Sequence, residues 1–258
     1  MGHEFVGEVI ATGSNVQLAV GTRVCAPFTT NCGQCFYCAA GLTSRCEQSQ
    51  LFGWRQNGAG LHGGQASRVL VPNADATLVP VPKSIDNATA LLVGDNLSTG
   101  RFCAEMVGIQ PDATYAVVGC GTVGLMAVLA SFRMGATQVF AVDPVASRRE
   151  LATSLGAHAF GPTDIGPAVH AATDGRGADG VMELVGSPAA QTLAYQLIRP
   201  GGTMSVIGCH CTPNFAFSPA DAYDKNLTYR TGRCPARHFM PLLFEELATQ
   251  PLLSLIHI

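Results

Sequence analysis

Two hydrophobic patterns divide the chain. Up to residue 83, short runs rich in Val, Ile and other apolar residues lie between Gly, Pro and Asn residues, a pattern typical of β-strands. Beyond residue 113, apolar runs of strand length alternate with stretches of helical length. The strands expected from these patterns are 4–11, 22–28, 66–71, 115–118, 138–142, 178–183 and 203–207. One expected helix follows the glycine turn and runs to about residue 134, and two others cover 146–155 and 188–198. Two further helices are expected to begin near Asp86 and near Asp95, and the second of these leads towards Val107.

The alternating half predicts right-handed βαβ units and a parallel sheet, hence an α/β fold. Residues 113–132 carry no charge and are long enough to cross a bilayer. Three glycines interrupt this run, so a buried strand, a tight turn and a buried helix are favoured over a membrane span.

The amino-acid composition reduces the number of possible functional classes. The 258 residues are 47% hydrophobic and 13% charged with a net charge of −3, which fits one large or two ordinary domains and excludes disorder. Since no basic excess exists, a nucleic-acid partner is disfavoured. The opening residues do not look like a signal peptide, so we expect a cytoplasmic protein whose clustered cysteines serve metal binding or catalysis rather than disulfides.

Four of the ten cysteines crowd into one loop: Cys32, Cys35, Cys38 and Cys46. Four thiolates at this spacing predict a closed tetrahedral structural zinc site. The alternatives are an iron–sulfur site or four unrelated buried cysteines. Cys209-His210-Cys211 also looks like a ligand cluster, but neighbouring side chains at a strand end point to opposite faces, which disfavours a shared metal.

A glycine motif, Gly119-Cys120-Gly121-Thr122-Val123-Gly124, follows an apolar strand and opens an apolar helix. This context favours a dinucleotide site: Gly119 for the turn, Gly121 for approach of the pyrophosphate to the helix N-terminus, and Gly124 for close packing. Asp143 ends the next strand, where its carboxylate would accept the ribose hydroxyls of NAD and repel the 2′-phosphate of NADP. The alternative is a glycine turn with a helix-capping Asp.

The cysteine loop and the glycine motif follow, in this order, a first motif, Gly2-His3-Glu4-Phe5-Val6-Gly7-Glu8-Val9. With these three motifs, nearly all of residues 2–250 resembles the zinc-dependent medium-chain alcohol dehydrogenases, especially the threonine, sorbitol and formaldehyde dehydrogenase branches. The resemblance implies an incomplete GroES-like β catalytic domain and a Rossmann doubly wound parallel sheet. It assigns 1–100 to the first part of the catalytic domain with its zinc lobe at 32–46, 101–230 to NAD binding, and 231–252 to the start of the return.

The resemblance also implies roles for single residues. His3 matches a ligand of the catalytic zinc, and Glu4 the carboxylate behind that metal. Asp95 occupies the third ligand position, which is often cysteine; its alternative is a helix N-cap. Thr99 matches the threonine beside the nicotinamide. Arg148 matches the basic residue near the adenosine ribose, with a solvated helix charge as the alternative.

Both ends of the chain bear on activity. In the resemblance, the first catalytic-zinc ligand, a cysteine, and the proton-relay residues fall before Met1, so we expect the chain as given to be an inactive, truncated fragment. Residues 253–258 resemble one translated frame of a transposon end used in sequencing libraries, and we expect a non-native tail.

The sequence therefore predicts a zinc-dependent oxidoreductase that transfers a hydride between NAD and a primary or secondary alcohol, polyol or aldehyde. The alternatives are a zinc-free quinone-type reductase of the same fold and a non-catalytic zinc-binding module. The expected cofactors are catalytic zinc, structural zinc and NAD. We expect a small-molecule alcohol or aldehyde substrate, no nucleic-acid or membrane partner, and a homo-oligomer for the intact protein.

Overall fold

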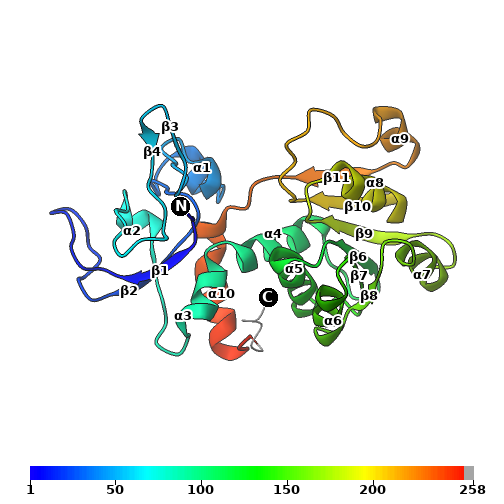
Figure 1. The fold of residues 1–258 in the computed structure, drawn as a ribbon, viewed down its shortest axis with the longest axis horizontal. Coiled ribbons are helices and arrows are strands. Elements are labelled where there is room, and N and C mark those ends of the chain that lie inside the picture. Colours follow the sequence, from blue (N-terminus) through cyan, green and yellow to red (C-terminus); the bar gives the residue numbers. More distant parts are fainter. Residues whose placement is uncertain (253–258) are drawn as a thin grey trace. The chain divides into compact units, whose positions relative to one another are not determined.

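The computed structural model describes residues 1–252; residues 253–258, the predicted non-native tail, lie outside this part. The chain folds into two compact units (Figure 1). Of the described residues, one unit contains Met1–Ser98 and 234–252, and the other contains Thr99–Arg233. The sequence had suggested boundaries after residues 100 and 230.

The first unit is built on an antiparallel sheet in the order β1-β2-β5. Its strands are β1 (Phe5–Glu8), β2 (Arg23–Ala26) and β5 (Val79–Pro80). One face of this sheet packs on a small core that includes Val24, Phe52 and Leu78. The remaining elements are α1 (Phe36–Ala39), the 3-10 helix η1 (Thr43–Arg45), the hairpin β3 (Arg55–Gln56) and β4 (Ala59–Gly60), α2 (Ala74–Thr77), α3 (Asn87–Val93) and α10 (Ala236–Thr249).

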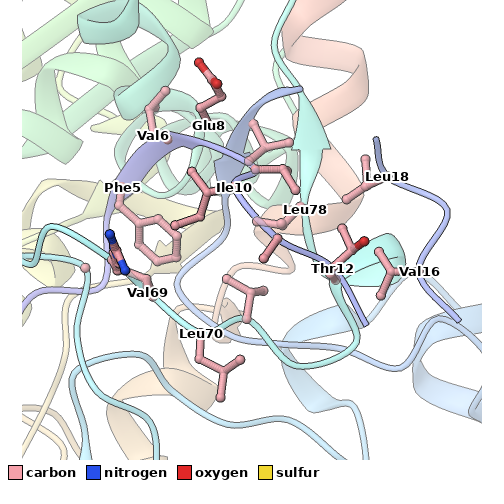
Figure 2. Close-up of a pocket in the computed structure, with 18 of the residues that line it drawn as sticks. Phe5, Val6, Glu8, Ile10, Thr12, Val16, Leu18, Val69, Leu70 and Leu78 are labelled. Atoms are coloured by element: carbon pink, nitrogen blue, oxygen red, sulfur yellow. The ribbon is translucent and has the colours of Figure 1, made fainter. Parts of the chain in front are cut away.

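One predicted strand is wrong. Residues 66–71 form no strand, although Val69 and Val71 do pack against the core of the first unit. Together with β1 they line a groove of about 290 Å³ (Figure 2), and β1 pairs with β2 rather than with this segment. An extended segment becomes a strand only when a neighbour accepts its backbone hydrogen bonds, and the apolar pattern carries no information about that neighbour.

The second unit is a six-stranded parallel sheet in the order β11-β10-β9-β6-β7-β8, as the α/β pattern predicted (Figure 1). Two strands, β7 and β9, have the predicted bounds. The strands are β6 (Thr114–Val118), β7 (Gln138–Val142), β8 (His158–Phe160), β9 (Ala178–Glu183), β10 (Ile198–Val206) and β11 (Thr228–Thr231). The helices are α4 (Asn96–Val107), α5 (Thr122–Arg133), α6 (Ala146–Ser154), α7 (Ile165–Ala172), α8 (Pro188–Leu197) and α9 (Pro219–Asp224).

The order of the strands positions the site. The chain runs outward from β6 to β7 and β8, then returns to the other side of β6 with β9 and continues to β10 and β11. The crevice at the carboxyl ends of β6 and β9, where this direction reverses, is where such sheets bind ligands.

No helix within residues 1–252 is long and apolar enough to span a membrane. The uncharged run 113–132 instead contains β6 and most of α5, with the glycine turn between them. Both elements are largely buried in the protein, which explains why they carry no charge.

Candidate metal and cofactor sites

The four clustered cysteines converge in the first unit. Cys35 lies at the N-terminal end of α1, Cys38 is inside that short helix, and Cys46 follows η1. The four Sγ atoms, including that of Cys32, all lie within 4.8 Å of one another. A tetrahedral zinc with 2.3 Å bonds would hold its sulfurs about 3.8 Å apart. The arrangement therefore fits a four-thiolate zinc site after a small contraction.

Backbone N–H groups point at the sulfurs of this lobe. Those of Cys32 and Gln48 donate to Cys46 Sγ at 3.2 and 3.3 Å. Backbone donors at Cys38 and Glu47 lower the pKa of Cys35 to about 6, whereas burial raises the pKa of Cys38 to about 12. A zinc ion bound here would hold all four groups as thiolates, because a coordinated thiol is deprotonated.

His3 and Asp95 meet across 92 residues of sequence. His3 precedes β1, and Asp95 lies in the turn between α3 and α4. The His3 Nε2 and Asp95 Oδ2 atoms are 3.0 Å apart, at the short end of the roughly 3–4 Å expected for two ligands of one zinc. Their hydrogen bond raises the pKa of His3, against the opposing effect of partial burial. The contact is compatible with a shared ion and equally with a direct hydrogen bond.

Glu4 and Phe28 complete the surroundings of His3. Asn96 donates a hydrogen bond to the Glu4 carboxylate. Burial, together with the charge of Asp95, raises the pKa of Glu4. The ring of Phe28, which is buried, packs edge-on against the imidazole of His3 with centroids 6.2 Å apart. One wall of this site is thus apolar and the other is acidic.

The donor set at His3 and Asp95 is smaller than that of the cysteine lobe. A catalytic zinc takes three protein ligands and keeps a fourth position open. Within residues 1–252, the cysteine lobe is the only set of three or more His, Cys, Asp or Glu side chains near enough to share an ion. If the His3–Asp95 pair bound a catalytic zinc, it would supply two of the three protein ligands that such a site takes.

The glycine motif forms an open cradle at the end of β6. Gly119 has φ +96°, a conformation that side chains disfavour, and a Cβ on Gly124 would overlap the Gly119 carbonyl oxygen. Gly121 faces open space, and no side chain caps α5, which begins with Thr122 and Val123. Uncapped N–H groups at a helix start attract an anion such as a pyrophosphate.

Asp143 lies beside this cradle, after the last residue of β7. Its Oδ2 accepts the Cys120 N–H at 2.9 Å and its Oδ1 the Val145 N–H at 2.8 Å. Since each carboxylate oxygen can accept a second bond, hydroxyl groups of a ligand can still be bound. Arg148 Nη1 is 3.6 Å from Oδ2, and Arg149, which sequence reasoning missed, binds the Asp143 carbonyl oxygen at 2.8 Å.

These groups line a pocket of about 600 Å³ in the second unit. Gly119, Gly121, Asp143 and Arg148 form one side, and Val185 belongs to the loop after β9. The volume suits a small-molecule ligand. Sequence reasoning did not identify the residues after β9 as part of this wall, because only strand order brings β9 next to β6.

Thr99 is buried within α4 and belongs to the second unit, whereas His3 and Asp95 belong to the first. Its proposed place beside a nicotinamide stays a prediction. The Cys209-His210-Cys211 cluster does not gather around a common centre; instead His210 binds Glu183, a residue that sequence reasoning also missed.

Two family models match the chain. One, described as alcohol dehydrogenase GroES-like domain, covers residues 1–83, and the other, zinc-binding dehydrogenase, covers residues 122–249. A zinc-type alcohol dehydrogenase B of Aspergillus flavus is 41% identical, over 96% of this chain and 59% of its own length. A medium-chain reductase/dehydrogenase of Acremonium is 42% identical, over 87% of this chain and 79% of its own.

Among solved structures, the alcohol dehydrogenase TADH from Thermus sp. ATN1 has the same fold, with a TM-score of 0.92 and 34% identity. The match covers 98% of this chain and 75% of that one. The chain thus spans about 59% of the length of the Aspergillus relative and three quarters of the Thermus protein.

Proposed function

The chain belongs to the zinc-dependent medium-chain alcohol dehydrogenase family, and we propose that this protein transfers a hydride between an alcohol and NAD. The substrate class is a primary or secondary alcohol, a polyol, or the matching carbonyl compound. The observation that carries the proposal is the open pocket of about 600 Å³ in which an uncapped helix start lies beside the Asp143 carboxylate. A pyrophosphate and a ribose diol are the ligand groups that these two features recognise.

The choice of NAD over NADP rests on charge. Asp143 is only 3% exposed and is fixed by two backbone N–H groups, so it cannot turn away from a 2′-phosphate. Arg148, whose side chain is half exposed, lies on the solvent side of this carboxylate and partly offsets the repulsion. We therefore propose a preference for NAD rather than absolute exclusion of NADP.

His3 and Asp95 would hold the catalytic zinc, and Cys32, Cys35, Cys38 and Cys46 the structural one. When bound, the catalytic zinc acts as a Lewis acid that lowers the pKa of an alcohol oxygen. Around it, Glu4 adds negative charge behind the two ligands, and Asn96 holds the Glu4 carboxylate in place. Phe28 shields one side of His3 from water.

Two other functions would use parts of the same fold. A quinone-type reductase needs no zinc, but a four-cysteine lobe and a His–carboxylate pair at 3.0 Å favour a zinc enzyme. A zinc-binding module without catalysis would need no pocket at the end of a Rossmann sheet. Zinc content combined with nucleotide binding separates these three functions.

The experiment is a fluorescence titration of the zinc-loaded protein with NADH and NADPH, before and after Asp143→Ala. We expect NADH to bind more tightly to the parent protein and the preference to fall by about tenfold or more in the variant, as loss of a hydrogen-bonded charge implies. Asp112→Ala removes an exposed carboxylate at the opposite, amino end of β6 and serves as the control. An unchanged preference in Asp143→Ala, or no nucleotide binding at all, would overturn the proposal.

A further inference from the structure

Glu183 is a buried carboxylate that the proposed chemistry does not use. It is the last residue of β9 and is fully buried. Its Oε1 accepts the backbone N–H groups of Val185 and Gly186, both at 2.8 Å. Its Oε2 binds His210 Nε2, also at 2.8 Å. A buried carboxyl group with three hydrogen bonds orders the segments that carry its bonding partners, because leaving any of these polar groups unpaired would cost free energy.

The Glu183 side chain connects two loops at the carboxyl edge of the sheet. One loop follows β9 and the other, which carries His210, follows β10. Their backbones are in close contact, since a Cβ on Gly208 would overlap the Gly186 N–H group. The Glu183 carbonyl oxygen also accepts the N–H groups of Ile207 and Gly208, at 3.0 and 3.1 Å. The Glu183 side chain therefore links the two loops through hydrogen bonds.

The loop after β9 reaches the cofactor pocket. Val185, whose N–H is held by Glu183, lines that pocket. Its Cγ2 atom lies against the space where a Cβ of Gly119 would stand. An altered position of Glu183 would therefore move a wall of the pocket directly beside the glycine cradle.

The order of the strands indicates which half of a bound dinucleotide lies near Glu183. Asp143, the proposed ribose-binding residue for the adenosine half, follows β7, on one side of β6. β9 and β10 lie on the other side. A dinucleotide lies across the switch point with its two mononucleotides on opposite sides, so the half with the nicotinamide extends over the ends of β9 and β10.

We propose that the Glu183–His210 pair is a positioning device for the nicotinamide half of the cofactor. It rests on the proposed function, because it presupposes a bound NAD. The carboxylate fixes the two loops and the ring of His210, whose side chain is 19% exposed. Both loops are then ordered before the nicotinamide nucleoside arrives, which lowers the entropic cost of binding that half.

The test compares NAD with a ligand that differs from it only by lacking the nicotinamide base. NAD carries the nicotinamide and its ribose, whereas ADP-ribose lacks the nicotinamide base. Dissociation constants for both are measured by calorimetry on the parent protein and on His210→Ala and His210→Gln. The Gln amide reaches the position of the imidazole Nε2 and restores a donor to Glu183. His158→Ala is the control, because His158 is the first residue of β8 and thus lies at the opposite, amino end of the sheet.

We expect His210→Ala to weaken NAD binding by about tenfold while ADP-ribose binding changes less than about twofold, and His210→Gln to recover most of the loss. Equal weakening of both ligands would show a purely structural role, and no change for either would show no role; each overturns the positioning proposal. If the parent protein bound neither ligand, the proposed function itself would fail, which is distinguishable from both outcomes.

Discussion

The cysteine lobe and the His3–Asp95 pair are both candidate zinc sites in the first unit, yet they are built differently. The lobe takes all four donors from residues 32–46, and its sulfurs lie within 4.8 Å of one another. The pair joins donors 92 residues apart at 3.0 Å. The lobe takes its donors from one short segment that contains α1 and η1, whereas the pair needs β1 and the turn between α3 and α4 to be packed correctly first.

This difference teaches how metal binding relates to folding in each site. A short loop without a core of its own gains its order from the metal, so zinc binding and lobe folding are one event. His3 and Asp95 are positioned by strand pairing and helix packing, since β1 pairs with β2 and α3 packs against β1. We therefore expect removal of zinc to disorder the lobe and to leave His3 and Asp95 in place.

The largest effect is expected from Cys35→Ser. Losing one of four thiolates should remove the lobe zinc and destabilise the first unit by about 4 kcal/mol or more. Zinc per chain, measured by mass spectrometry of metals, and the thermal midpoint should fall together. Cys211→Ser, an exposed cysteine outside the lobe, should change neither. A parent-like zinc content in Cys35→Ser would show that the lobe is not a metal site.

Asp95→Ala should change the stability less than Cys35→Ser does, and it should weaken zinc binding only outside the cysteine lobe. The substitution removes a proposed zinc ligand, so the affinity for zinc beyond the lobe's ion should fall by at least about tenfold, the loss typical even of outer partners. Because the carboxylate is partly exposed, the free energy of unfolding should fall by only about 1 kcal/mol. A competition titration with a zinc chelator measures the affinity.

The control for Asp95 is Glu8→Ala, which removes an exposed carboxylate at the end of β1. It should leave both zinc affinities unchanged. If Asp95→Ala also leaves the second affinity unchanged, the Asp95 carboxylate is a hydrogen-bond partner of His3 and not a ligand, and the contrast between the two sites disappears.

The smallest effect is expected from Asp86→Ala. Asp86 caps α3 by accepting the Thr89 N–H at 2.8 Å, and losing the cap should cost about 1 kcal/mol. The same bond holds the pKa of Asp86 below its ordinary value, so this contribution is present at neutral pH and is lost as pH falls through the lowered pKa. Chemical denaturation at neutral and at acid pH measures the difference.

Because α3 leads into the turn that carries Asp95, Asp86→Ala should loosen the pair and not the lobe. Asp86→Asn, which retains a capping oxygen, is the matched control and should be close to the parent protein. A fall in lobe zinc with Asp86→Ala would mean that the two sites are energetically coupled, contrary to the comparison above.

Local signals predicted much of the second unit. β7 and β9 have the predicted bounds because each is a short buried run ended by a turn or a charged residue. The predicted strand 203–207 lies mostly within β10, which begins earlier, at Ile198, with an irregular register against β9. The sequence pattern does not predict β8 and β11, because these two edge strands are only partly buried and lack a continuous apolar run.

What the sequence determined by itself is the chemistry that lies close together along the chain: the four-cysteine loop, the glycine turn after β6 and the Asp that follows β7. In each of these, neighbouring residues already share a loop or one βαβ unit, so spacing alone specifies the geometry. Tertiary structure decided that His3 bonds to Asp95, that Glu183 bonds to His210 in the loop after β10, and that residues 66–71 form no strand. The physical reason is that such contacts depend on which strands become neighbours, and that choice is made by packing of the whole unit rather than by any local pattern.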